Sequence, residues 1–156
     1  MAELDGLNVK LKYIRHEGVY FDTLPAYKTA GSAGCDLVAA IDAPLIMPPG
    51  ERTAVPTGVA ISIGDPGYAG FIFARSGLGL KHGIGLPNGV GVIDSDYTGE
   101  LLVALVNLSS EPYTINPGDR IAQLVFMPVA QAVFEDVEEL PGTTRGGGGF
   151  GSTGTR

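Results

Sequence analysis

The sequence predicts an all-β fold, either a sandwich or a barrel, with roughly ten short strands. Turn signals that combine proline and glycine recur along the chain, at residues 48–51, 56–58, 65–68 and 116–119. The runs between them are short and rich in aliphatic, β-branched and aromatic residues, which favours strands. No window carries a sustained apolar stripe of helical period, so we expect at most one short helix, near residues 76–82.

The strand candidates differ in how their side chains alternate. Residues 9–13 (VKLKY) alternate apolar and basic side chains, and residues 59–63 (VAISI) alternate less cleanly, so both are predicted to be half-buried strands. Residues 101–106 (LLVALV) are all apolar. Such a run suits a strand that is buried on both faces, either in the core or against another subunit.

The chain is predicted to form one domain, at residues 1–140, followed by a flexible tail at 141–156. Its length of 156 residues and hydrophobic content of 44% are enough for a sizeable core. Six of the last twelve residues are glycine, which loses the most backbone entropy on ordering, so the tail is not expected to join the core. It nevertheless offers the charge of Arg145, the ring of Phe150 and the hydroxyls of Ser152 and Thr153, which suit an anionic ligand that carries a ring.

Charge and cysteine content narrow the class of protein. A net charge of −7 argues against a protein that coats nucleic acid, although local arginines can still hold a small anion. The single cysteine, Cys35, cannot form an intrachain disulfide, which favours a reducing, cytoplasmic setting. The polar, acidic N-terminus is unlike a signal peptide, and no apolar run approaches the roughly 18 residues that span a membrane.

Asp94 is the candidate general base. Residues 96–99 (DYTG) have aspartate first and glycine fourth, as a type I turn prefers, so Asp96 has a structural explanation. Asp94 follows an apolar pair and precedes that turn, where no turn or cap rule requires a carboxylate. For Tyr97 taken alone, half-buried packing is favoured over contact with a ligand.

Arg75 and Ser76 follow an apolar run at residues 71–73 and form a candidate anion site. Ser76 is predicted to cap the short helix, an interaction worth about 1 kcal/mol. A helix start beside an arginine also suits an anion, and the two roles are compatible. Gln123 lies between apolar neighbours, where its amide either completes an internal network, which we favour, or points into a pocket.

Taken together, these segments resemble those of the trimeric deoxyuridine triphosphatases, the dUTP nucleotidohydrolases. Five short motifs mark that family, and all occur here in order: 33–37 (AGCDL), 75–78 (RSGL), 88–100 (NGVGVIDSDYTGE), 118–124 (GDRIAQL) and 145–154 (RGGGGFGSTG). Cys35 and Gly79 depart from the residues usual at those positions, but neither is a reacting group. The resemblance implies a jelly-roll-like, distorted β-barrel and a homotrimer in which all three chains contribute to each active site.

The resemblance also implies the reaction. The substrate would be dUTP, hydrolysed to dUMP and pyrophosphate when a water activated by Asp94 attacks the α-phosphorus. Such an activity limits uracil incorporation into DNA and supplies dUMP for thymidylate synthesis. Mg²⁺ would bind mainly through the substrate phosphates and waters, with Asp36 assisting through a water.

The resemblance assigns substrate contacts to four of the motifs. The second and fourth motifs and the tail would hold the phosphates, and the third motif would hold the uracil and the sugar. Tyr97 would exclude a 2′-hydroxyl, and Phe150 would stack on the base. The implied substrate-binding residues are Arg75, Ser76, Gly77, Asn88, Gly91, Ile93, Tyr97, Gln123, Arg145, Phe150, Gly151, Ser152 and Thr153. Ordering ten tail residues costs roughly 10–20 kcal/mol, about what its contacts return, so we expect the tail to close only over bound nucleotide.

Two alternatives remain open from the sequence. A dCTP deaminase shares the fold family and the triphosphate site, but such relatives lack the glycine-rich tail with its phenylalanine. A catalytically silent nucleotide sensor, or a purely structural jelly roll, would gain nothing from a carboxylate such as Asp94 beside a bound anion.

Overall fold

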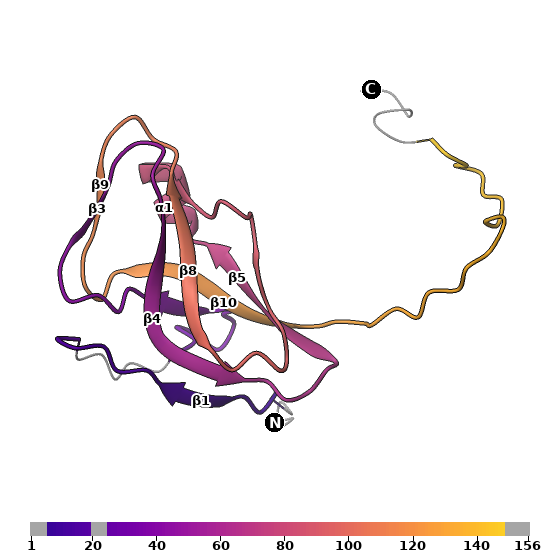
Figure 1. Cartoon of the computed structure of the whole chain (residues 1–156), viewed down its shortest axis with the longest axis horizontal. Coiled ribbons are helices and arrows are strands. Elements are labelled where there is room, and N and C mark those ends of the chain that lie inside the picture. The colour runs from indigo at the N-terminus through magenta and orange to yellow at the C-terminus, as the bar shows by residue number, and fades with distance from the viewer. Residues whose placement is uncertain (1–5, 20–24, 149–156) are drawn as a thin grey trace.

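The computed structural model of this chain describes residues 6–19 and 25–148, and in that part it is almost entirely β (Figure 1). The prediction of an all-β fold with about ten strands and one short helix is confirmed. The elements, in chain order, are β1 (Lys10–Tyr13), β2 (Cys35–Val38), β3 (Leu45–Met47), β4 (Arg52–Ser62), β5 (Tyr68–Ala74), α1 (Ser76–His82), β6 (Ile84–Gly85), β7 (Gly91–Ile93), β8 (Glu100–Asn107), β9 (Tyr113–Ile115) and β10 (Arg120–Pro128).

Two four-stranded antiparallel sheets and one two-stranded sheet make up the fold. Their strand orders are β1-β4-β8-β6, β2-β10-β5-β7 and β3-β9. Neighbours in space are mostly distant in sequence, as in a jelly roll. Apolar side chains from both large sheets meet in one core, which includes Leu37, Val55, Leu101 and Leu124, each at most 1% exposed. Burial of these side chains is the main stabilisation of the fold.

Three of the four proline-glycine signals form turns as predicted. The amide of Glu51 donates to the carbonyl of Pro48, that of Tyr68 to Asp65, and that of Asp119 to Asn116. The fourth signal, at 56–58, was predicted to separate strands and does not. It lies inside β4, where the register against β8 shifts between Pro56 and Ala60. Gly58, at φ +70°, takes the left-handed conformation that such a bulge uses.

Helix α1 lies where the sequence predicts it, but its start differs. Arg75, with extended backbone angles, is the N-cap, and Ser76 is the first helical residue. No side chain makes a capping hydrogen bond there, so the predicted capping role of Ser76 is wrong. The helix ends at Gly83, which at φ +67° donates its N–H to the carbonyl of Gly79.

Strand β8 is not buried on both faces within one chain. Leu101, Val103 and Leu105 are at most 1% exposed, whereas Leu102 on the opposite face is 52% exposed. The face of this run opposite the core is therefore open at Leu102 but buried again at Val106, which is 8% exposed. A contact of the open part with another subunit stays a prediction.

After β10 the chain leaves the sheets (Figure 1). All residues from 130 to 148 are exposed, and Val133 and Phe134 are more than nine-tenths exposed. The division of the chain at residue 140 stays a prediction. Within the described residues, no helix has the length and apolarity needed to cross a membrane.

Candidate active site

A small cavity lies where β7 turns into β8. Its volume is about 170 Å³, enough for about six waters or a single small ring. Three predicted site residues, Ile93, Asp94 and Tyr97, line it together. The complete lining is Val92, Ile93, Asp94, Tyr97, Glu100, Leu101 and Leu102.

The turn beside this cavity differs from the predicted one. The amide of Tyr97 donates to the carbonyl of Asp94 at 3.1 Å, so the turn spans 94–97 and not 96–99. Asp94 is its first residue, a position that favours aspartate, and the argument that set Asp94 apart from turn chemistry is wrong. Its location distinguishes it instead, because Asp94 is exposed and lines both this cavity and a neighbouring one of about 500 Å³.

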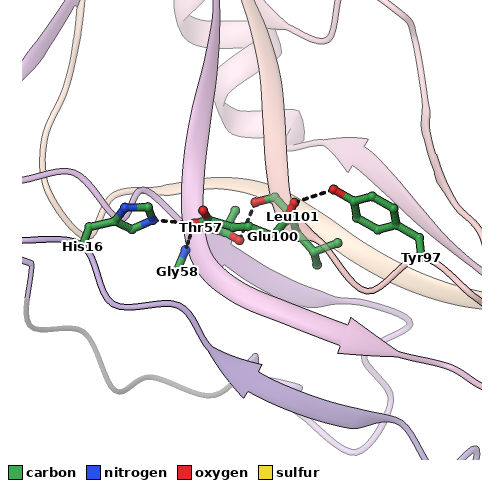
Figure 2. Close-up of polar contacts among 6 residues, drawn as sticks. All are labelled: His16, Thr57, Gly58, Tyr97, Glu100 and Leu101. Atoms are coloured by element: carbon green, nitrogen blue, oxygen red, sulfur yellow. Dashed lines mark hydrogen bonds and ion pairs between the residues drawn. The ribbon is translucent and has the colours of Figure 1, made fainter.

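The ring of Tyr97 folds back over the start of β8. Its hydroxyl donates to the backbone carbonyl of Glu100 at 3.0 Å (Figure 2). A Cβ at Gly99 would lie 2.5 Å from the Tyr97 hydroxyl oxygen, so this pose requires glycine there. Tyr97 remains 43% exposed, and its ring therefore forms an accessible wall of the cavity.

Glu100 connects the cavity to the rest of the fold, and the sequence analysis missed it. Its Oε1 accepts the Gly58 amide at 2.9 Å and lies 2.7 Å from His16 Nε2, as Figure 2 shows. Just beyond it, the Thr57 hydroxyl donates to the carbonyl of Leu101 at 2.7 Å.

A second cluster joins two arginines through Asp36. Arg75 Nε lies 3.3 Å from Asp36 Oδ1, and Arg120 Nη1 lies 3.1 Å from Asp36 Oδ2. Arg75 Nη1 also donates to the Arg120 carbonyl at 3.0 Å. The sequence analysis did not single out Arg120, although its motif contains it.

Beside the two arginines lies a cavity of about 200 Å³. Burial raises the pKa of Tyr113 on its wall, Asp119 raises that pKa further, and Arg75 opposes the shift. The cavity is lined by Arg75, Leu78, Ile84, Leu105, Tyr113, Ile115, Asp119, Arg120 and Ile121.

The other residues predicted to hold the phosphates lie at or near the cluster of Asp36, Arg75 and Arg120. Ser76 and Gly77 are exposed at the start of α1. Gln123 lies on β10, is exposed, and pairs in register with Asp36 on one side and Phe73 on the other. Its side chain makes no hydrogen bond within the described residues, so the internal network favoured for it is wrong.

Within one chain, the cavity that Asp94 lines and the cluster of Asp36 with its two arginines lie far apart. Gly70 on β5 pairs with Ile93, next to Asp94, while Arg75 lies beyond the far end of β5. The five residue steps from Gly70 to Arg75 cover roughly 16 Å along the sheet. Asn88 is exposed before β7, at the Arg75 end. The two cavities share no lining residue.

The described residues contain no group of three or more histidine, cysteine or acidic side chains that could hold a metal ion. Both carboxylate oxygens of Asp36 face guanidinium groups, so its charge is already used to orient arginines. This geometry does not favour a metal role for Asp36.

Burial raises the pKa of the Cys35 thiol, and this side chain faces the core.

The tail supplies only one predicted contact within the described residues. Arg145 is exposed, and its carbonyl accepts the amide of Gly148 at 3.1 Å. The other predicted contacts, Phe150, Gly151, Ser152 and Thr153, lie outside the described residues.

Comparison with known proteins places these features in a family. The family model of the dUTPases matches residues 22–154. The chain is 58% identical over 133 residues to the deoxyuridine 5′-triphosphate nucleotidohydrolase of Neisseria meningitidis serogroup A, covering 85% of this chain and 89% of that one. It is equally identical, over the same length, to the enzyme of that name from Burkholderia cenocepacia, with 85% and 90% covered.

Solved structures with a similar fold are dUTPases as well. The Staphylococcus bacteriophage 80alpha dUTPase with dUPNHPP has a TM-score of 0.83 and 27% identity, with 95% of this chain and 99% of that one covered. The dUTPase from phage phi11 of S. aureus has a TM-score of 0.74 and 26% identity, with 85% and 97% covered. The five motifs, the β fold and these similarities together show that this chain belongs to the dUTPase family.

Proposed function

We propose that this protein hydrolyses dUTP to dUMP and pyrophosphate. The observation that carries the proposal is the cavity at the β7–β8 turn, where a carboxylate, an aromatic ring and a strand edge surround space for one small ring. The curated relatives that are 58% identical to it over 133 residues bear the name of this activity.

Asp94 is the proposed general base. It is exposed at the mouth of the cavity, so water can reach its carboxylate. From this position it would take a proton from a water that attacks the α-phosphorus in line with the pyrophosphate leaving group. General base catalysis of this kind contributes roughly a hundred- to ten-thousandfold in rate.

The sugar would enter this cavity, and the base would extend from it along β7 toward Asn88. Backbone groups at Gly91 and Ile93, with the amide of Asn88, would distinguish uracil from cytosine by their donors and acceptors. The Tyr97 ring would lie against the deoxyribose and leave no room for a 2′-hydroxyl. A site that rejects an extra group by shape needs rigid walls. The Tyr97 ring meets this need because its hydroxyl donates to the Glu100 carbonyl at 3.0 Å.

The triphosphate would be held by the arginine cluster. Arg75, oriented by Asp36, would contact phosphate oxygens together with Ser76, Gly77 and Gln123. Mg²⁺ would arrive on the substrate phosphates and neutralise part of their charge. A structural Mg(II) ion is named in a phage phi11 dUTPase structure of 25% identity.

Two features support the proposal that active sites are shared between the subunits of a homotrimer. The two clusters lie at opposite ends of β5 in one chain, so a neighbouring chain would bring Arg75 to the cavity that holds Asp94. The exposed Leu102 beside that cavity gives β8 an apolar face for such a neighbour. A trimer in the cytoplasm, limiting uracil in DNA and supplying dUMP, is the setting we propose.

The tail would complete the site after substrate binds. Arg145, Ser152 and Thr153 would contact the terminal phosphate, and Phe150 and Gly151 would cover the uracil. Residues 130–148 are all exposed, which supports a segment that reaches another subunit.

Product analysis tests the activity and its nearest alternative together. Purified protein with Mg²⁺ is given dUTP or dCTP, and pyrophosphate and ammonia are measured in each reaction. Pyrophosphate from dUTP without ammonia from dCTP is expected. Ammonia from dCTP would identify a deaminase, and nucleotide binding without either product would identify a silent sensor.

A further inference from the structure

Glu100 makes three contacts to segments far apart in sequence. Its side chain reaches His16, which follows β1, and Gly58, in the bulge of β4, while its backbone carbonyl accepts the Tyr97 hydroxyl (Figure 2). The Glu100 side chain is 17% exposed and that of His16 is 35% exposed. These bonds are therefore partly shielded from water, which strengthens them.

The bulge in β4 explains why a carboxylate is needed there. At the bulge the ladder to β8 is interrupted, so Gly58 has no backbone register partner on that strand. Glu100 Oε1 accepts this amide at 2.9 Å, and the amide of Ile14 donates to the Gly58 carbonyl at 2.7 Å. Glu100 thus fastens the first residue of β8 to β4 and to the segment after β1.

This attachment decides where the Tyr97 hydroxyl is held. Tyr97 is 43% exposed, and its bond to the Glu100 carbonyl is its only side-chain hydrogen bond within the described residues. The position of that carbonyl follows the backbone of Glu100, which the side-chain contacts hold together with its register pairing to Ala60. A shift at Glu100 would therefore move the ring at the cavity wall.

We propose that Glu100, held by His16 and the Gly58 amide, is a positioning residue that sets discrimination against the 2′-hydroxyl through Tyr97. The inference rests on the proposed function, because it concerns the sugar selectivity of that site. It assigns no contact with nucleotide to His16, and it extends selectivity to this residue, which lies outside the five motifs.

The measurement is kcat/KM for dUTP and for UTP in the purified full chain. Glu100→Ala should lower the dUTP to UTP ratio by about ten- to hundredfold, the scale of a displacement of about 1 Å. Glu100→Gln keeps an oxygen that accepts the Gly58 amide, so it should restore the ratio to within about threefold of the wild type. His16→Ala should reduce the ratio less than Glu100→Ala does.

A matched control separates positioning from loss of stability. Ser109 lies just beyond the other end of β8, where its hydroxyl donates to the Asn107 side chain at 2.7 Å and to the Glu111 carbonyl at 2.9 Å. Ser109→Ala removes hydrogen bonds from the same strand without touching the cavity. It should lower the melting temperature and leave the dUTP to UTP ratio unchanged.

A double variant tests the route through Tyr97. Once Tyr97→Phe has removed the hydroxyl, adding Glu100→Ala should change the ratio little further. Independent, multiplicative effects of the two substitutions would overturn the inference, as would an unchanged ratio in both Glu100→Ala and His16→Ala. If Glu100→Ala does not fold, His16→Ala and Glu100→Gln decide the question.

The outcomes also distinguish this inference from the proposed function. Wild-type protein that releases no pyrophosphate from dUTP overturns both. Wild-type protein that prefers dUTP strongly, together with variants that keep the same preference, overturns only the positioning role of Glu100.

Discussion

Asp36 Oδ1 lies 3.3 Å from Arg75 Nε, a contact that joins β2 to the residue after β5 across the intervening strand β10. The Asp36 side chain is 9% exposed and that of Arg75 is 24% exposed. Neither of these two buried atoms has another hydrogen-bond partner among the described residues. The guanidinium that we assign to the triphosphate is therefore oriented by this carboxylate, together with the Arg120 carbonyl that accepts from its Nη1.

Asp36→Asn tests this orientation. The substitution keeps the shape of the side chain but removes the charge that holds Arg75 and Arg120, so KM for dUTP should rise about tenfold while kcat changes less. The free energy of unfolding should fall by about 1–3 kcal/mol. Asp42→Asn makes the same change at an exposed carboxylate and is the control, and an unchanged KM in Asp36→Asn would contradict the assignment.

The buried thiol of Cys35 predicts a stability that falls at alkaline pH. Burial raises the pKa of Cys35 above its ordinary value of 9.0, and the thiol donates to the Leu124 carbonyl at 3.5 Å. Above pH 9 the unfolded chain ionises this thiol while the folded chain keeps it neutral, so unfolding releases a proton and stability is lost as pH rises.

Urea unfolding between pH 8 and 10.5 measures this effect against Cys35→Ala. The wild type should lose up to about 1.4 kcal/mol more per pH unit than the variant does above pH 9. Tyr113, whose pKa burial also raises, contributes equally to both proteins, whereas the raised pKa of Tyr27 is due to burial and in part to Cys35, so its contribution changes with Cys35→Ala. Parallel pH profiles would show that Cys35 titrates normally in the folded chain.

Asn107 predicts a large loss of stability on substitution. It is fully buried, and its amide donates to the carbonyls of Met47 and Glu111, both at 2.8 Å. Asn107→Leu removes the side-chain donor to the Met47 carbonyl and the side-chain acceptor of the Ser109 amide at similar side-chain volume, so the free energy of unfolding should fall by about 2–6 kcal/mol. Asn116→Leu, at an exposed position in a turn, should cost less than about 1 kcal/mol. Similar losses for the two variants would refute the structural role of Asn107.

Truncation after residue 144 tests the tail. The shortened chain should fold with an unchanged melting temperature, because residues 130–148 are exposed, but kcat/KM for dUTP should fall by about a hundredfold or more. In the full chain, a non-hydrolysable dUTP analogue should protect residues 145–156 from proteolysis. Equal cleavage with and without the analogue would count against closure over the substrate.

Local signals in the sequence predict the strands and most turns, because those features depend on neighbouring residues. Where long-range pairing decides, the sequence alone misleads. The proline and glycine at 56–58 have the composition of a turn, yet pairing with β8 turns them into a bulge. Both Asp94 and Asp96 suit the first position of a turn, and the structure places the turn hydrogen bond at Asp94.

In the candidate site, too, local sequence predicts some features and long-range contacts decide others. The motifs bring Ile93, Asp94 and Tyr97 to one cavity as predicted, because they lie within a few residues of each other. The contact of His16 with Glu100 joins positions 84 residues apart, and no local pattern indicates it. The link from Asp36 to Arg120 spans the same separation.

The most direct test compares Asp94→Asn with Asp96→Asn in pyrophosphate release from dUTP, dCTP, dTTP and UTP. The two substitutions make the same chemical change two residues apart, and only Asp94 lines the cavity beside Tyr97. We expect the wild type to cleave dUTP far faster than the other three nucleotides, Asp94→Asn to lose at least about a hundredfold in kcat, and Asp96→Asn to keep most of its activity. Near-normal turnover of dUTP by folded Asp94→Asn would contradict the assignment of Asp94 as the base.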